Sequence, residues 1–222
     1  MALSKPKILK FEELIIGLPL AALLAFSVNS KINIGLRHIL LAYPLLIIFT
    51  GRLAQERFLE GSKGLKVLAA TIVLLGFETL SAAPNYLSFF NRAAGGPKAG
   101  VKYLSDSNID WGQDLKGLGK FLKKEGDCEV LLSYFGSAVP LAYGIRYQAL
   151  PTVWEWPKSE HINSPNPKKE FCAVSVSNLQ GTYFGDHAYY AWLLEREPYK
   201  IIGDSIYVYD VTGDRKKVFR KP

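Results

Sequence analysis

Three long apolar runs dominate the first 83 residues of this 222-residue chain. The runs are residues 14–28, 39–51 and 67–77. A helix needs roughly 20 apolar residues to cross the hydrocarbon of a bilayer, and each run approaches that length when its weakly polar flanks are counted. Three such runs would overfill the core of a small soluble domain, so the sequence predicts three transmembrane helices. We expect them at about residues 12–30, 37–53 and 65–83. Three buried helices of a soluble protein are one alternative, and a signal peptide is an alternative for the first run.

The charges between the runs predict an orientation. Basic residues are frequent in the first ten residues and between the second and third runs, whereas the loop between the first and second runs carries only Lys31 and Arg37. Because cytoplasmic loops of membrane proteins are enriched in lysine and arginine, we expect a cytoplasmic N-terminus and an extracytoplasmic position for residues 84–222. The net charge of +7 is not gathered into basic clusters. It fits a solvated surface or anionic lipid better than nucleic acid.

Residues 84–222 predict a small α/β domain. Strands are expected at residues 128–136, 171–179 and 205–211, with amphipathic helices at 114–125 and 186–197. Helices that alternate with strands indicate an α/β layer. The fold class is therefore membrane α-helical over residues 1–83, followed by an extracytoplasmic α/β domain.

Two cysteines, Cys128 and Cys172, fall in the predicted domain. No C-x-x-C pair is present, so a zinc site is not expected. An extracytoplasmic compartment permits a disulfide between them. Two inert thiols in the core are the equal alternative.

The stretch D106-S-N-I-D-W-G-Q-D114 concentrates polar residues. A calcium loop of the EF-hand type needs a glutamate at its twelfth position, where this chain has Gly117, so no metal of that kind is expected and only an irregular divalent-cation site stays open. Asp106, Asp110 and Asp114 would share one helix face if the segment were helical, as catalytic carboxylates could. Helix capping is the simpler interpretation.

The order of these residues resembles a known family. N91-RAAGGPKAGVKYLSDSNIDWGQDLKGL118 resembles a block near the C-terminus of bacterial polyprenyl-phosphate-dependent membrane glycosyltransferases of the GT-C type, family 39. These enzymes are related to protein O-mannosyltransferases and the lipid A aminoarabinose transferase. Similar stretches are S30-KINIGLRHILLAYP44, Y134-FGSAVPLAYGI145, V174-SVSNLQGTY183 and E195-REPYKIIGDSIYVYD210. The residues that carry the motif are Tyr43, Pro44, Asp106, Asn108, Asp110, Trp111, Gln113 and Asp114.

The resemblance implies a multi-pass protein of the bacterial inner membrane with a periplasmic C-terminal domain. It also implies a sugar donor linked to polyprenyl phosphate. The family's catalytic acid lies upstream of the matching region, so no catalytic residue is expected here, and the chain is expected to be inactive without an N-terminal membrane subunit. Lys31, Arg37 and His38 are candidates to bind the lipid phosphate, although Lys31 and Arg37 could simply anchor helix ends.

Two functions from different classes follow. One is the C-terminal part of a membrane glycosyltransferase, and the other is a non-catalytic, membrane-anchored extracytoplasmic domain for binding or structural support. A remnant without retained function is a third reading. Sugar contacts by aromatic residues are a weaker expectation, because such residues more often lie in a core or at a membrane interface.

Overall fold

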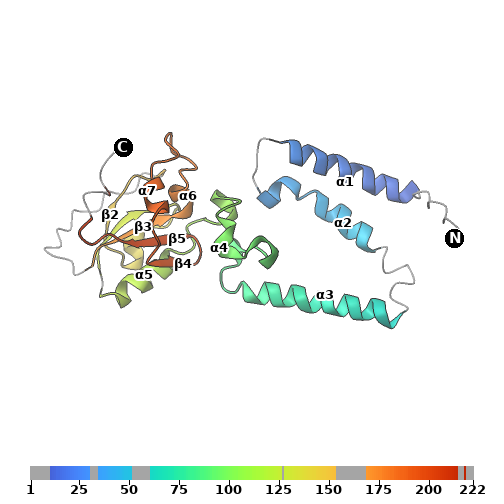
Figure 1. The fold of residues 1–222 in the computed structure, drawn as a ribbon, viewed down its shortest axis with the longest axis horizontal. Coiled ribbons are helices and arrows are strands. Elements are labelled where there is room, and N and C mark those ends of the chain that lie inside the picture. The colour runs from blue at the N-terminus through green and yellow to red at the C-terminus, as the bar shows by residue number, and fades with distance from the viewer. Residues whose placement is uncertain are drawn as a thin grey trace. The chain divides into compact units, whose positions relative to one another are not determined.

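The computed structural model describes residues 11–30, 35–51, 61–126, 128–153, 169–214 and Val218. It divides into two compact units, Met1–Ser81 and Ala82–Pro222, and each is described here by itself. The sequence placed the division two residues later, after Ala83. The first unit is helical and the second is an α/β domain (Figure 1).

In its described residues, 11–30, 35–51 and 61–81, the helical unit has three α-helices and a short 3-10 turn. They are α1 (Phe11–Asn29), η1 (Gly35–Ile39), α2 (Ala42–Gly51) and α3 (Ser62–Ser81). Helix α1 packs against α2 and η1. At 1.5 Å per residue, α1 and α3 are about 28 and 30 Å long and α2 about 15 Å.

The apolar side chains of this unit are exposed. Ala42 and Gly64 are the buried residues within its described part, while Val28 is 84% exposed and Val73 69%. By length and composition, one helix in the described chain, α3, could cross a membrane, and the apolar stretches of α1 and α2 are shorter. The structure therefore agrees with a helical first unit and leaves three crossings as a prediction. Helices that expose apolar residues all round require apolar surroundings.

The α/β domain is built on a five-stranded mixed sheet, with strand order β2-β1-β3-β5-β4. The strands are β1 (Val130–Ser133), β2 (Tyr147–Ala149), β3 (Phe171–Ser175), β4 (Lys200–Ile202) and β5 (Ile206–Asp210). Strands β2, β1 and β3 are parallel, and β5 pairs antiparallel with both β3 and β4. The predicted α/β layer is confirmed at this level.

Helices cover both faces of the sheet (Figure 1). They are α5 (Leu115–Lys124) on one face, and α6 (Val176–Leu179) and α7 (Ala191–Leu194) on the other. Strand β5 shows why both faces are apolar. Its Ile206 and Val208 pack in the cluster with α5, whereas Tyr209 packs in the cluster with α6 and α7. Because helices cover both faces, this strand carries aliphatic side chains on one face and tyrosines on the other, rather than apolar side chains on one face alone.

Both cysteines are free in the structure. Cys172 is fully buried in the cluster with α6 and α7, and Cys128 packs at the edge of the cluster with α5. The sheet separates the two thiols, so the described structure corresponds to two separate thiols rather than a disulfide.

Three details differ from the sequence-based expectation. The predicted strand 171–179 ends at Ser175 and continues as α6, and the predicted helix 186–197 is helical only in α7. Strands β2 and β4 had no prediction. The remaining short helical segments are η3 (Tyr86–Ser88), η4 (Arg92–Ala94), α4 (Pro97–Gly100), η5 (Asp106–Asn108) and η6 (Pro140–Tyr143).

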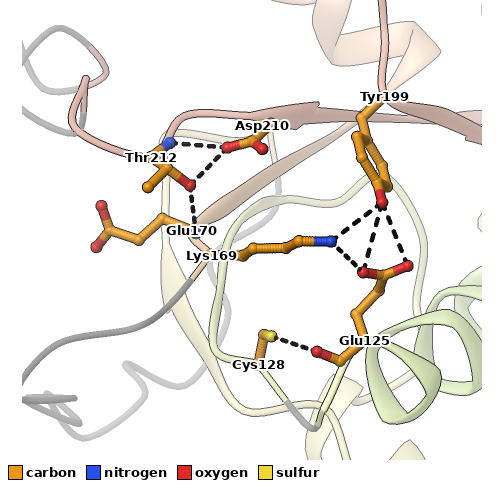
Figure 2. A network of polar contacts seen from close by, with 7 residues as sticks. All are labelled: Glu125, Cys128, Lys169, Glu170, Tyr199, Asp210 and Thr212. Carbon is orange, nitrogen blue, oxygen red and sulfur yellow. Dashed lines mark hydrogen bonds and ion pairs between the residues drawn. The ribbon is translucent and has the colours of Figure 1, made fainter.

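A network of polar contacts lies at the amino ends of β1 and β3 (Figure 2). Lys169 Nζ lies 2.9 Å from Glu125 Oε2 and 3.3 Å from the Tyr199 hydroxyl. Thr212 Oγ1 donates to Asp210 and accepts the Glu170 N–H. These contacts tie the end of α5 and the end of β5 to the start of β3, at the edge opposite the aspartate block.

Candidate functional site

The block Asp106–Asp114 lies at the carboxyl ends of β1 and β3. Three contacts place it there. The Tyr134 hydroxyl, one residue beyond β1, donates to Gly112 O over 2.7 Å. The Ser177 N–H, in α6 directly after β3, lies 3.5 Å from Asp110 Oδ2, and the Ser205 hydroxyl, before β5, donates to Asp114 Oδ2 over 2.6 Å. In open α/β sheets, ligands bind outside the carboxyl ends of the strands, so this is the candidate site.

Asp110 is the most buried acid of the block, with no exposed surface. Its Oδ1 accepts the Gly112 N–H over 2.9 Å, which forms an Asx turn. Its Oδ2 faces the Ser177 N–H at the start of α6. Burial raises the pKa of Asp110 from 3.8 to about 7, and the two N–H groups offset only part of this rise.

Asp114 precedes α5 but makes no side-chain hydrogen bond that caps it. Its carboxylate instead reaches across to the turn between β4 and β5, where it accepts the Ser205 hydroxyl. Burial raises the pKa of Asp114 to about 6, with a smaller contribution from the neighbouring Asp204. Gly203 has φ of 57°, and a Cβ there would overlap the Asp114 carboxylate. The glycine is what allows the close approach.

The other polar side chains of the block form hydrogen bonds with residues close to them in the sequence. Asp106 Oδ2 accepts the Ser107 hydroxyl over 2.7 Å, and Asn108 Nδ2 donates to Ser105 O over 3.1 Å. Gln113 Oε1 accepts the Trp111 N–H, and Gln113 Nε2 donates to Ile109 O.

Only Asp106–Asn108 is helical within the block, as η5. The three aspartates therefore do not line one helix face. A row of three carboxylates would need a continuous helix from Asp106 to Asp114, and the block does not form one.

This arrangement favours a structural role for the aspartates over a catalytic one. A catalytic acid must reach the reacting atoms, whereas Asp110 is covered and spends both oxygens on backbone N–H groups. Trp111 is 60% exposed, and its indole N–H donates to Ser107 O. Within the described residues, no three histidine, cysteine or acidic side chains gather where they could hold a metal ion, and the divalent cation stays a prediction.

The other predicted binding residues belong to the helical unit. Arg37 and His38 lie in η1, where Arg37 is exposed and His38 is half-buried, with its ring 6.4 Å from that of Phe26 in α1. Tyr43 and Pro44 lie in the first turn of α2. Lys31 lies outside the described residues. These residues belong to the helical unit, and the aspartate block belongs to the α/β domain.

Sequence reasoning missed Ser177, Ser205 and Tyr134 as partners of the block. A signal for Ser177 was present, because small polar residues follow the buried run of β3 immediately, as expected at the carboxyl edge of an α/β sheet. Tyr134 likewise directly follows β1. Nothing local predicts Ser205, whose role depends on the pairing of β4 with β5.

Comparison with known proteins adds no relative. No family model matches the chain, no curated protein matches it, and no solved structure matches it.

Proposed function

We propose that this chain is the C-terminal, membrane-embedded part of a glycosyltransferase that uses a sugar donor linked to polyprenyl phosphate. In this proposal, α1, α2 and α3 cross the bacterial inner membrane, and the α/β domain lies in the periplasm. The chain contributes to donor binding, and the catalytic acid belongs to a separate N-terminal membrane part. The resemblance of the DSNIDWGQD block to this enzyme family supports the proposal.

The observation that carries the proposal is the position of Arg37 between two packed apolar helices. A polyprenyl phosphate has a long apolar tail and an anionic head. Helices α1 and α2 expose apolar side chains along their length, and η1, which follows α1 and precedes α2, carries the exposed residue Arg37. Arginine binds phosphate through two parallel hydrogen bonds. The hairpin therefore offers apolar surface for the tail and a cation for the head.

Donor binding tests this proposal. The full chain in detergent is titrated with a short-chain isoprenyl phosphate, and binding is followed by native mass spectrometry. Because hydrogen bonds to charged groups contribute about 1.5–3 kcal/mol, Arg37→Ala should weaken binding at least about tenfold. Lys66→Ala, which removes an exposed cation from the first half of α3, is the matched control and should leave affinity unchanged. Equal affinities of both variants and the parent chain would refute the phosphate role.

One observation favours the second function, a membrane-anchored domain without catalysis. Asp110 has no exposed surface and is bound to backbone N–H groups, so the most distinctive acid of the chain acts as a structural acceptor. Failure of the chain to bind isoprenyl phosphate at all, with the α/β domain folded, would support this second function.

A further inference from the structure

We propose that residues 84–105, the first segment of the α/β domain, dock this domain on the anionic headgroup surface of the bilayer that holds α3. The proposal relies on the proposed function only in that α3 crosses a membrane. It does not depend on donor binding or on any transfer reaction.

The composition of the segment is unusual for a soluble surface. Residues 84–105 contain no aspartate or glutamate and carry three cations, Arg92, Lys98 and Lys102, all of them exposed. The segment therefore presents positive charge, which complements anionic lipid headgroups.

The same segment exposes large aromatic and aliphatic side chains. Tyr86 is 54% exposed and Tyr103 60%, and Leu87 and Phe89 are exposed as well. Tyrosine is enriched where membrane proteins meet the interface, because its ring is apolar and its hydroxyl is polar. Cations and interfacial aromatics in one segment match the two components of a bilayer surface, the anionic headgroups and the adjoining apolar layer.

Hydrogen bonds hold the segment to the carboxyl edge of the sheet. Asn85 Nδ2 donates to Asp204 over 3.4 Å, and the Ser88 hydroxyl lies 3.4 Å from Gly203 O. At its other end, Val101 O accepts Gln180 Nε2 over 2.6 Å, and the Ser105 hydroxyl accepts that of Thr182 over 3.1 Å. These contacts are made by small polar side chains and one backbone carbonyl of the segment, and they fix both of its ends to the domain.

Connectivity limits how far the segment can be from the bilayer. Helix α3 ends at Ser81, and η3 begins at Tyr86. Four intervening residues span at most about 14 Å when fully extended, which is about twice the depth of one headgroup layer. If α3 crosses the membrane, the start of the segment must lie at or near its surface.

Hydrogen–deuterium exchange of the full chain in nanodiscs tests the proposal. Exchange is compared in neutral phosphatidylcholine and in phosphatidylcholine with anionic phosphatidylglycerol. We expect the amides of residues 84–105 to exchange roughly tenfold more slowly in the anionic discs, because each cation near an anionic surface is attracted to it, and to lose this difference at high salt. Amides of α3 in the same spectra report whether that helix is embedded.

Two charge variants supply the contrast. The test variant combines Arg92→Gln, Lys98→Gln and Lys102→Gln. The control combines Lys116→Gln, Lys120→Gln and Lys124→Gln on the exposed side of α5, with the same change in net charge. The test variant should lose the lipid-dependent protection and the control should keep it. Near-ultraviolet circular dichroism verifies that both variants are folded.

The outcomes separate docking from the proposed function. Protected α3 amides with equal exchange of residues 84–105 in both discs would refute docking alone, and unprotected α3 amides would refute membrane insertion as well. Protection that persists in the test variant, or that appears in detergent without a bilayer as protein concentration rises, would show another occupant, such as a second copy of the chain, and would overturn the proposal.

Discussion

Replacing Asp110 with asparagine should remove a defined part of the pH dependence of the α/β domain's stability. Burial raises the pKa of Asp110 from 3.8 to about 7 in the folded domain. The folded state therefore holds this proton more tightly than the unfolded chain does. The contribution to the free energy of unfolding is complete below about pH 4 and is lost as the pH rises through about 7.

The size of the effect follows from the shift. One pKa unit corresponds to about 1.4 kcal/mol, so the whole window is worth at most about 4 kcal/mol. Asp114, with its pKa raised to about 6, contributes in the same direction at lower pH. Between pH 6 and 7 Asp110 dominates, and the free energy of unfolding should fall by about 1 kcal/mol in the parent chain.

Asparagine matches a protonated aspartic acid in shape and keeps an acceptor for the Gly112 N–H, but it has no proton to lose. The Asp110→Asn variant should therefore lose most of the fall between pH 6 and 7, keeping only about 0.3 kcal/mol from Asp114 in that interval and the rest of the Asp114 dependence below pH 6. Urea unfolding of the full chain in mild detergent measures this. Near-ultraviolet circular dichroism follows the buried tyrosines of the α/β domain, and a change of 1 kcal/mol moves the urea midpoint by roughly 0.5 M.

Asp186 provides a matched control. Its Oδ1 accepts the Ala188 N–H over 2.9 Å, the same local turn at the same distance as Asp110 with Gly112, but Asp186 is exposed. Asp186→Asn should keep the parent's pH dependence. A parent-like slope in Asp110→Asn, or an equal loss in both variants, would refute the link between burial and titration.

Two further predictions concern the same domain. Gly112→Ala should destabilise it by about 3 kcal/mol, because φ of 75° disfavours a side chain and a Cβ would overlap the Tyr134 hydroxyl. The control Gly185→Ala has open space around it and should change the urea midpoint little. Similar urea midpoints for the two variants would contradict the close packing of Gly112 against Tyr134. Cys172 is fully buried, and burial raises its pKa to about 12, so it should react with a maleimide only after unfolding. The partly exposed Cys128 should react first. Intact-mass analysis measures the order of reaction, and a disulfide-linked pair would contradict this prediction.

The sequence predicted those elements whose pattern is long and regular. Helix α5 follows a clear period of leucine and phenylalanine between lysines, and β5 was found from its alternating aliphatic and tyrosine residues. Strands β2 and β4 have three residues each and lie at the two sheet edges. Such strands exist because of a distant partner, and a local pattern cannot indicate that partner.

Two errors have a common cause in continuous burial. Residues 171–179 are all buried, and a short run without amphipathic periodicity does not distinguish a strand from a helix, so the change to α6 after Ser175 was missed. The expected helix 186–197 had a helical pattern, but its first part forms turns in which Asp186 accepts the Ala188 N–H and Tyr190 donates to Pro151 O. Tertiary contacts of this kind override local propensity.

The composition of the aspartate block has a structural explanation that requires no reaction. The end of β1, the start of α6 and the turn before β5 meet at this edge, and each brings a hydrogen-bonding group or a close backbone contact. Two acids provide acceptors for Ser177 and Ser205, and Gly112 provides the space beside Tyr134. The block therefore supports the fold of the α/β domain in this chain, and the proposed donor binding must be tested at Arg37 in the helical unit.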